Sequence, residues 1–143
     1  MSIFLVGLVL FVGIHSVYIV APGVREAAIA RIGYNPWRGI YSLVSLAGLV
    51  LLIYGYGLAR QDPVLLFEPP VWARDFAFVL MAVALPLLVA SFFPVATRIG
   101  RFVRHPMLMS VTLWSVAHAL AIGTLAGVLL SAVFFIWTLA ARF

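Results

Sequence analysis

The sequence contains no lysine and no cysteine, and only four of its 143 residues are acidic. Without cysteine there are no disulfides, thiolate metal ligands, iron–sulfur clusters or cysteine nucleophiles. Charged residues make up 9% of the chain and hydrophobic residues 66%, with a mean hydropathy of +1.21. A soluble domain is about half apolar and about a quarter charged, so a water-soluble globule is excluded. The positive charge comes from nine arginines in a nearly uncharged background, which does not indicate a nucleic-acid-binding surface.

Long apolar runs make up most of the chain. About 20 apolar residues are needed to cross a bilayer core as a helix. The runs are Ser2–Ala21, Gly39–Ala59, Phe76–Thr97 and Met107–Ala141. The last of them is too long for one span and is interrupted at Ile122–Thr124. The sequence therefore predicts an all-α, polytopic membrane helical bundle of about five transmembrane helices, as a single domain over residues 1–143.

The arginines gather in alternate connecting segments. Pro22–Arg38 and Arg98–Arg104 carry three arginines each, whereas Arg60–Asp75 carries two arginines and three acids. Positively charged loops stay on the cytoplasmic side, so we expect the N-terminus outside and the C-terminus, at Arg142, inside. No basic lead or cleavage site precedes the first helix, so we expect that helix to remain in the mature protein.

Turns and close helix contacts are also readable in the sequence. Asn35-Pro36 and Asp62-Pro63 are typical turn starters, Glu68–Pro70 favours an extended stretch, and Pro86 is expected to kink the third run. Small residues that recur at helical spacing let helix backbones approach closely. One such face is expected on the second run and one on the fourth: Tyr41, Ser45, Gly48, Leu52 and Gly55, and then Ser115, Ala119 and Gly123.

Three histidines lie in or near the predicted spans. His15 is on the first helix, His118 is on the fourth, and His105 directly precedes Pro106 where the fourth begins. An ionisable group inside a bilayer is costly and by default marks a functional site. The alternative for the two central histidines is a neutral imidazole hydrogen-bonded across helices to a serine. The serines within reach of such a bond are Ser16, Ser42, Ser45 and Ser115. For His105, capping of the helix or contact with lipid headgroups is an equal alternative to a functional role.

The depths of His15 and His118 favour one shared ligand. At about 1.5 Å per residue, His15 lies roughly 9 Å above the inner end of its helix, and His118 roughly 17 Å above Met107. Two imidazoles offset by roughly 8 Å on facing helices can ligate one haem iron, which takes two axial nitrogens. They are too few for a tetrahedral zinc site, and every acid lies in a loop. The sequence therefore predicts a haem with His15 and His118 as its metal ligands.

Several separated blocks of the chain resemble the NnrU family. They are Gly13–Ser16 with Val24-Arg25, Arg38–Leu46, Tyr56–Val64, and His105–Leu108 with Leu113-Trp114 and Ala117-His118. The resemblance covers nearly the whole chain. It implies a multi-pass protein of the bacterial inner membrane linked to denitrification, with nitrite or nitric oxide reductase as a membrane oxidoreductase partner.

The same superfamily includes the 15-cis-zeta-carotene isomerase, a haem b membrane enzyme. Its two haem histidines correspond to His15 and His118, so the resemblance implies haem b as cofactor and an isomerase-like or redox activity. Where the isomerase has a cysteine near the haem, this chain has Ser115. A serine hydroxyl is a poor iron ligand, which argues against isomerisation switched by cysteine ligation.

Haem propionates need cationic partners, and the arginines offer three candidates. Arg25 and Arg104 are the candidates if the propionates point to the inner side, and Arg60 is the candidate if they point to the outer side.

Two other functions stay open, and whether the protein is an enzyme is also open. The first is a non-enzymatic membrane partner that assists maturation of nitrite or nitric oxide reductase, with histidines that only link helices. The second is an S-adenosylmethionine-dependent methyltransferase, because Arg104–Met107 is similar to the Arg-His-Pro-x-Tyr motif of isoprenylcysteine carboxyl methyltransferases. Leu108 replaces the tyrosine and no acid follows Asp75, so the cofactor would lack a counter-charge.

Overall fold

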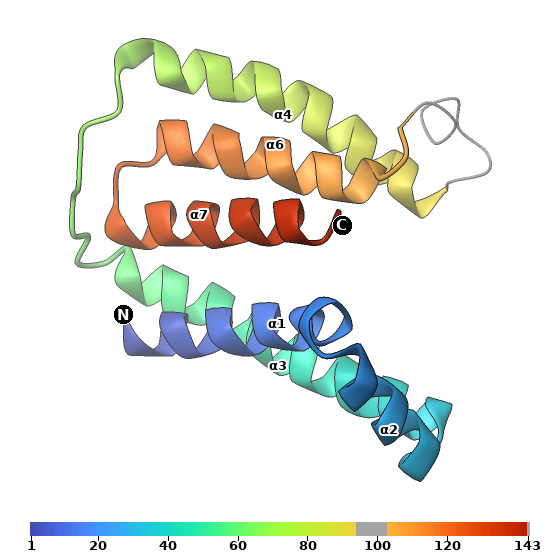
Figure 1. Ribbon diagram of the computed structural model, residues 1–143. Helices are drawn as coiled ribbons and strands as arrows, with labels where there is room; N and C mark the ends of the chain where they lie inside the picture. Colours follow the sequence, from blue (N-terminus) through green and yellow to red (C-terminus); the bar gives the residue numbers. More distant parts are fainter. Residues whose placement is uncertain (94–102, 143) are drawn as a thin grey trace. The chain divides into compact units, whose positions relative to one another are not determined.

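A computed structural model describes residues 1–93 and 103–142, and these form six helices (Figure 1). The helices are α1 (Ser2–Val20), α2 (Pro22–Ile32), α3 (Tyr34–Ala59), α4 (Val71–Phe92), α6 (Pro106–Ala121) and α7 (Leu125–Ala140). Within the two described ranges the one β-type feature is an isolated bridge between Leu65 and Thr124. The predicted all-α class is confirmed. The contacts divide the chain into two compact units, Met1–Pro63 and Val64–Phe143, and each is described by itself.

Two sequence predictions fall partly outside the described residues. Arg98 and Arg101 of the second basic segment lie there, as do residues 94–97 at the end of the third apolar run.

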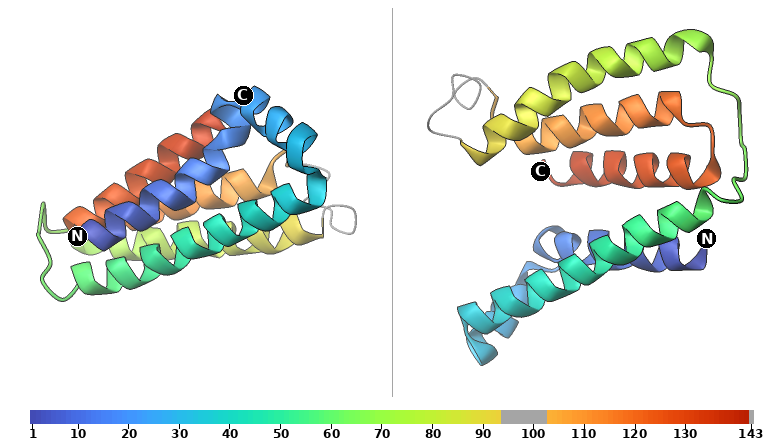
Figure 2. Two further views of the ribbon diagram at one scale, coloured as in Figure 1. Left: turned by 90° about the horizontal axis from the view of Figure 1, so that it is seen from below. Right: turned by 180° about the vertical axis from the view of Figure 1, so that it is seen from behind.

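In the first unit, α1 packs along α3 with very little space between the two backbones (Figure 2). A Cβ atom added at Gly48 would lie 2.7 Å from the backbone nitrogen of Phe11, and one added at Gly55 would meet the backbone of Phe4. Because the contacts run in opposite directions along the two helices, α1 and α3 are antiparallel. Gly48, Leu52 and Gly55 are buried, which confirms this part of the predicted small-residue face.

The segment between the first two predicted spans is largely helical. α2 starts with Pro22 at its first position, where the missing N–H leaves no helix hydrogen bond unmade. α3 begins at Tyr34, before the predicted start at Gly39. The predicted turn at Asn35-Pro36 is therefore wrong, because proline is tolerated in the first turn of a helix. The turn lies at Gly33 instead, with φ 87° and ψ 163°.

We expect Gly33→Ala to lower the free energy of unfolding by about 1–3 kcal/mol, because these dihedral angles are essentially restricted to glycine. Gly23→Ala is the matched control, since no atom lies within 4 Å of a Cβ added there on α2. Thermal unfolding in detergent, followed by circular dichroism, measures both. Equal stability of the two variants would contradict the assignment of the turn to Gly33.

In the second unit, α6 packs against both α4 and α7 (Figures 1 and 2). Ser110 of α6 is 3% exposed and donates a hydrogen bond of 2.7 Å to the carbonyl oxygen of Ala84 on α4. Toward α7, the hydroxyl oxygens of Thr112 and Thr138 lie 3.0 Å apart. α4 remains helical through Pro86, and the predicted kink there stays a prediction. Hydroxyl groups thus link the three helices where lipid would offer no hydrogen-bond partner.

The predicted break in the last apolar run is confirmed, because α6 ends and α7 begins on either side of residues 122–124. This turn pairs with the segment that precedes α4. The Leu66 amide donates to the carbonyl oxygen of Gly123 at 2.8 Å, and the Leu125 amide donates to that of Val64 at 2.8 Å. The pairing anchors residues 64–66, just before the predicted extended stretch Glu68–Pro70, to the α6–α7 turn.

Gly123 has a different role from the one that the sequence indicated. It lies outside α6, and a Cβ added to it would meet the carbonyl oxygen of Phe67. Its assignment to a helix-packing row with Ser115 and Ala119 is therefore wrong. The helix ends before Gly123, and the glycine is needed for contact with an extended segment.

Three helices, α1, α3 and α4, are long and apolar enough to cross a membrane by length and composition. α6 and α7 are apolar but contain 16 residues each. At about 1.5 Å per residue they are roughly 24 Å long, shorter than a hydrocarbon core of about 30 Å. The chain is thus an all-helical membrane protein, while the count of five spans and the orientation of the termini stay predictions.

Candidate functional site

His118 lies half-buried in the last turn of α6. Its Nδ1 atom is 2.8 Å from the carbonyl oxygen of Trp114, one turn earlier. Because a carbonyl oxygen can only accept, Nδ1 carries the proton and Nε2 carries the lone pair. The Trp114 ring lies against the imidazole, with centroids 4.4 Å apart and planes inclined by 33°. The helix therefore holds this ring in the tautomer that can bind a metal through Nε2.

His15 repeats the same local arrangement on α1. Its Nδ1 atom is 2.7 Å from the carbonyl oxygen of Phe11, and the two ring centroids are 4.4 Å apart at 37°. Tyr41 of α3 meets the imidazole edge-on at 5.5 Å. In both units an aromatic residue four positions earlier orients the histidine, and the same nitrogen faces the backbone.

The serines next to these histidines make bonds inside their own helices. Ser16 donates to the carbonyl oxygen of Val12, and Ser115 donates to that of Val111, each at 2.7 Å. A hydroxyl has one proton, so neither serine donates to an imidazole. The alternative that serine hydroxyls hold the histidines gains no support at these two positions.

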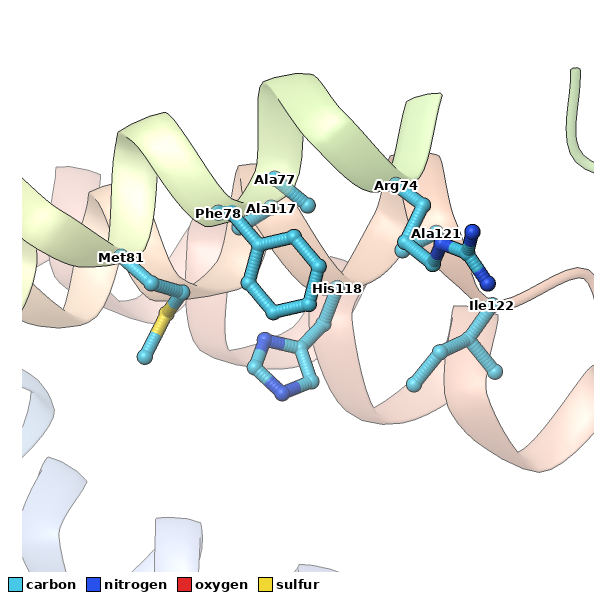
Figure 3. A pocket seen from close by; sticks show the side chains of 8 residues that line it. All are labelled: Arg74, Ala77, Phe78, Met81, Ala117, His118, Ala121 and Ile122. Carbon is cyan, nitrogen blue, oxygen red and sulfur yellow. The ribbon is translucent and has the colours of Figure 1, made fainter. Parts of the chain in front are cut away.

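His118 lines a pocket of about 200 Å³ between α4 and α6 (Figure 3). Most of the lining is apolar, but Arg74 from the first turn of α4 also contributes. In the view of Figure 3 the imidazole lies between Met81 on one side and the Arg74 guanidinium on the other. Pockets that enclose an organic ligand usually measure about 300–1,000 Å³, so this one fits only an edge of a porphyrin. The pocket therefore brings the His118 ring and the Arg74 side chain together on an otherwise apolar surface.

The other residues predicted from the sequence lie elsewhere. His105 and Arg104 are exposed at the N-terminal end of α6, opposite to His118. His105 is the N-cap residue of α6, but its side chain makes no capping hydrogen bond. In the other unit, Arg60 is exposed at the end of α3 and Arg25 is half-buried on α2.

Arg74 is the residue of this pocket that sequence reasoning missed. It precedes Asp75 at the end of an acidic connecting segment, where a solvated arginine is the ordinary expectation. Its place beside His118 depends on how α4 packs on α6, and buried small residues such as Ala73 and Ala77 allow that contact. No linear motif connects positions so far apart in the chain.

Within residues 1–93 and 103–142, no three histidine, aspartate or glutamate side chains come together in a group that could hold a metal ion. Tetrahedral zinc sites made entirely of protein ligands need four such donors. Haem iron takes only one or two axial ligands from the protein. Two histidines are too few for such a zinc site, and haem ligation by His15 and His118 stays a prediction.

Comparison with known proteins gives one family match. The family model described as NnrU protein matches residues 3–143, nearly the whole chain and both of its units. No curated protein and no solved structure matches the chain.

Proposed function

The chain belongs to the NnrU family, and on this premise we propose that it is a haem b-binding membrane protein that supports denitrification. The proposed iron ligands are His15 and His118. Family membership supports the link to denitrification, and the donor chemistry of the two imidazoles supports haem.

The geometry of His118 is the observation that carries this proposal. Ligating histidines almost always donate their other ring N–H to a carbonyl or carboxylate oxygen, which fixes the ring and makes the ligating nitrogen more basic. His118 has this bond to Trp114, and its ring faces an apolar pocket. An imidazole that only linked helices would instead direct Nε2 to a hydrogen-bond donor on a neighbouring helix, and among the described residues the His118 ring makes no such bond.

Arg74 is the proposed partner of a haem propionate. Arginine pairs strongly with carboxylates through two parallel hydrogen bonds. Arg74 lines the same pocket as His118, whereas Arg104 lies at the opposite end of α6. The sequence-based candidates Arg25 and Arg60 belong to the other unit and stay predictions.

A haem b supplies one-electron redox chemistry, and its protein sets the ligation and the surroundings. Here the chain provides two oriented imidazoles and apolar helices. Ser115 is buried, and its hydroxyl donates to the backbone of Val111. No thiol is present to exchange with a histidine, so the residues favour electron transfer or haem sensing over isomerisation by ligand exchange.

The absorption spectrum of the purified protein tests the proposal. Protein made with ample haem should be red, with the Soret band of bis-histidine haem. His118→Ala and His15→Ala should each lower the bound haem by about tenfold or more, since a lost second-shell partner alone costs about 10–100-fold in metal affinity. His105→Ala is the matched control at the other end of α6 and should keep the spectrum.

Three outcomes would contradict haem ligation by these residues. Colourless wild-type protein would favour the non-enzymatic role in reductase maturation. Equal haem loss in His105→Ala and His118→Ala, with unchanged circular dichroism, would show that His118 is not a specific haem ligand. Thermal stabilisation by S-adenosylmethionine that His105→Ala abolishes would favour the methyltransferase.

A further inference from the structure

A pocket of about 370 Å³ lies in the first unit, between α2 and the N-terminal part of α3. Its lining residues are Arg25, Tyr34, Trp37, Arg38, Tyr41 and Ser42. The five residues from α3 recur at spacings of three and four, so they share one face of the helix. Further along α3, the same face packs against α1 through Gly48.

Two arginines contribute positive charge to this pocket. Arg25 is half-buried on α2, and the Arg38 guanidinium lies 5.6 Å from the centre of the Tyr34 ring. In the part of the chain that the structure describes, neither guanidinium has an ion pair or a hydrogen bond. The unit contains two acids: Glu26, which is exposed, and Asp62, which follows the far end of α3 from the pocket. The positive charge of the pocket is therefore not neutralised from within this unit.

The donor groups of the pocket suit a phosphate. A guanidinium presents a planar fork of N–H donors that matches two phosphate oxygens. Tyr41, Ser42 and Trp37 also line the pocket, and their side chains carry neutral donor groups. The volume falls within the range of about 300–1,000 Å³ that is usual for small-molecule sites.

The position of the pocket favours a lipid over a soluble anion. The pocket lies at the N-terminal end of α3, a candidate membrane span. Along α3 from the pocket, Leu43 and Leu46 are 69% and 58% exposed and offer an apolar surface to acyl chains. Basic pockets beside membrane helices bind anionic headgroups, and tryptophan and tyrosine are enriched at that depth. We propose that this pocket binds the phosphate of an anionic phospholipid headgroup through Arg25 and Arg38, independently of any haem.

Lipid titration of the full chain in detergent tests this site. Phosphatidylglycerol should raise the melting temperature and saturate, whereas phosphatidylcholine and inorganic phosphate should have little effect. Arg25→Gln and Arg38→Gln should each weaken the apparent affinity about tenfold, as expected for the loss of a hydrogen bond to a charged phosphate. Arg31→Gln is the matched control, because Arg31 is exposed on α2 and does not line the pocket, and it should change the affinity by less than about twofold at physiological salt, where exposed charges away from the phosphate are screened.

Each other outcome overturns the proposal. An equal loss in Arg31→Gln would indicate general attraction to the surface, and saturation by inorganic phosphate would indicate a soluble anion. A fall in bound haem in Arg25→Gln with unchanged lipid affinity would assign the arginine to a propionate. If a glutamine variant does not fold, Arg25→Lys and Arg38→Lys replace it in the lipid titration. Lysine keeps the charge but lacks the paired N–H donors of a guanidinium. Unchanged lipid affinity in both lysine variants would therefore show that the arginines do not bind the phosphate through paired hydrogen bonds.

Discussion

Gly55→Ala is expected to lower the free energy of unfolding by about 3 kcal/mol, at the upper end of overpacking costs. The added methyl group would meet the backbone nitrogen and Cα of Phe4 on α1. Backbone atoms cannot rotate away as the end of a side chain can, so a whole helix must shift. That shift would also loosen the contact between Gly48 and Phe11 on the same face.

Gly57→Ala is the control for this prediction, with the same substitution on the same helix. Gly57 is exposed, and no atom lies within 4 Å of a Cβ added there. Alanine is the better helix former, so this variant should be unchanged or more stable by up to about 1 kcal/mol. Unfolding in mixed micelles of increasing dodecyl sulfate content, followed by circular dichroism, measures both. Equal destabilisation of the two variants would show that α1 does not limit the space at Gly55.

Gly123→Ala, in the second unit, is expected to lower the free energy of unfolding by a similar amount, about 3 kcal/mol. Its Cβ would meet the carbonyl oxygen of Phe67, and Gly123 also accepts the amide of Leu66. Moving this turn would break the bond between the Leu125 amide and Val64 at the start of α7. The cost therefore combines a steric clash with the loss of hydrogen bonds in a region with few alternative partners.

Amide hydrogen exchange localises this effect. In Gly123→Ala the amides of Leu66 and Leu125 should exchange faster, while those in the middle of α3, in the other unit, should be unaffected. Unchanged protection at both amides, together with unchanged stability, would contradict the pairing of the α6–α7 turn with residues 64–67.

The two histidines show how much of the candidate site a local sequence pattern can predict. His15 and His118 stand out in the sequence as ionisable groups in apolar runs, and each has an aromatic residue four positions earlier. That spacing places the ring over the preceding turn of a helix, where the carbonyl oxygen of the same aromatic residue holds Nδ1. Their orientation could thus have been predicted from the sequence, because it depends on one helix only.

The connecting segments were harder to predict from the sequence. The stretch around α2 combines arginines, glycine and proline with little apolar periodicity, so the sequence predicts a connector with a turn at Asn35-Pro36. Proline ends a helix when it occurs in the interior but suits the first turn. Whether a proline ends a helix or lies in its first turn therefore depends on where the helix begins. Here α3 begins at Tyr34, directly after the turn at Gly33.

The amino-acid sequence alone determined the membrane character, the helical class, the family, the break before α7 and the two oriented histidines. These features depend on hydrophobicity and on residues one or two helical turns apart, and such neighbours keep their spacing wherever the helix packs. Only the tertiary structure placed Arg74 in the pocket of His118, Gly123 against Phe67, and Arg25 and Arg38 in one pocket. Each of these pairs joins different segments, and their alignment follows from the register in which the backbones pack, which no local pattern encodes.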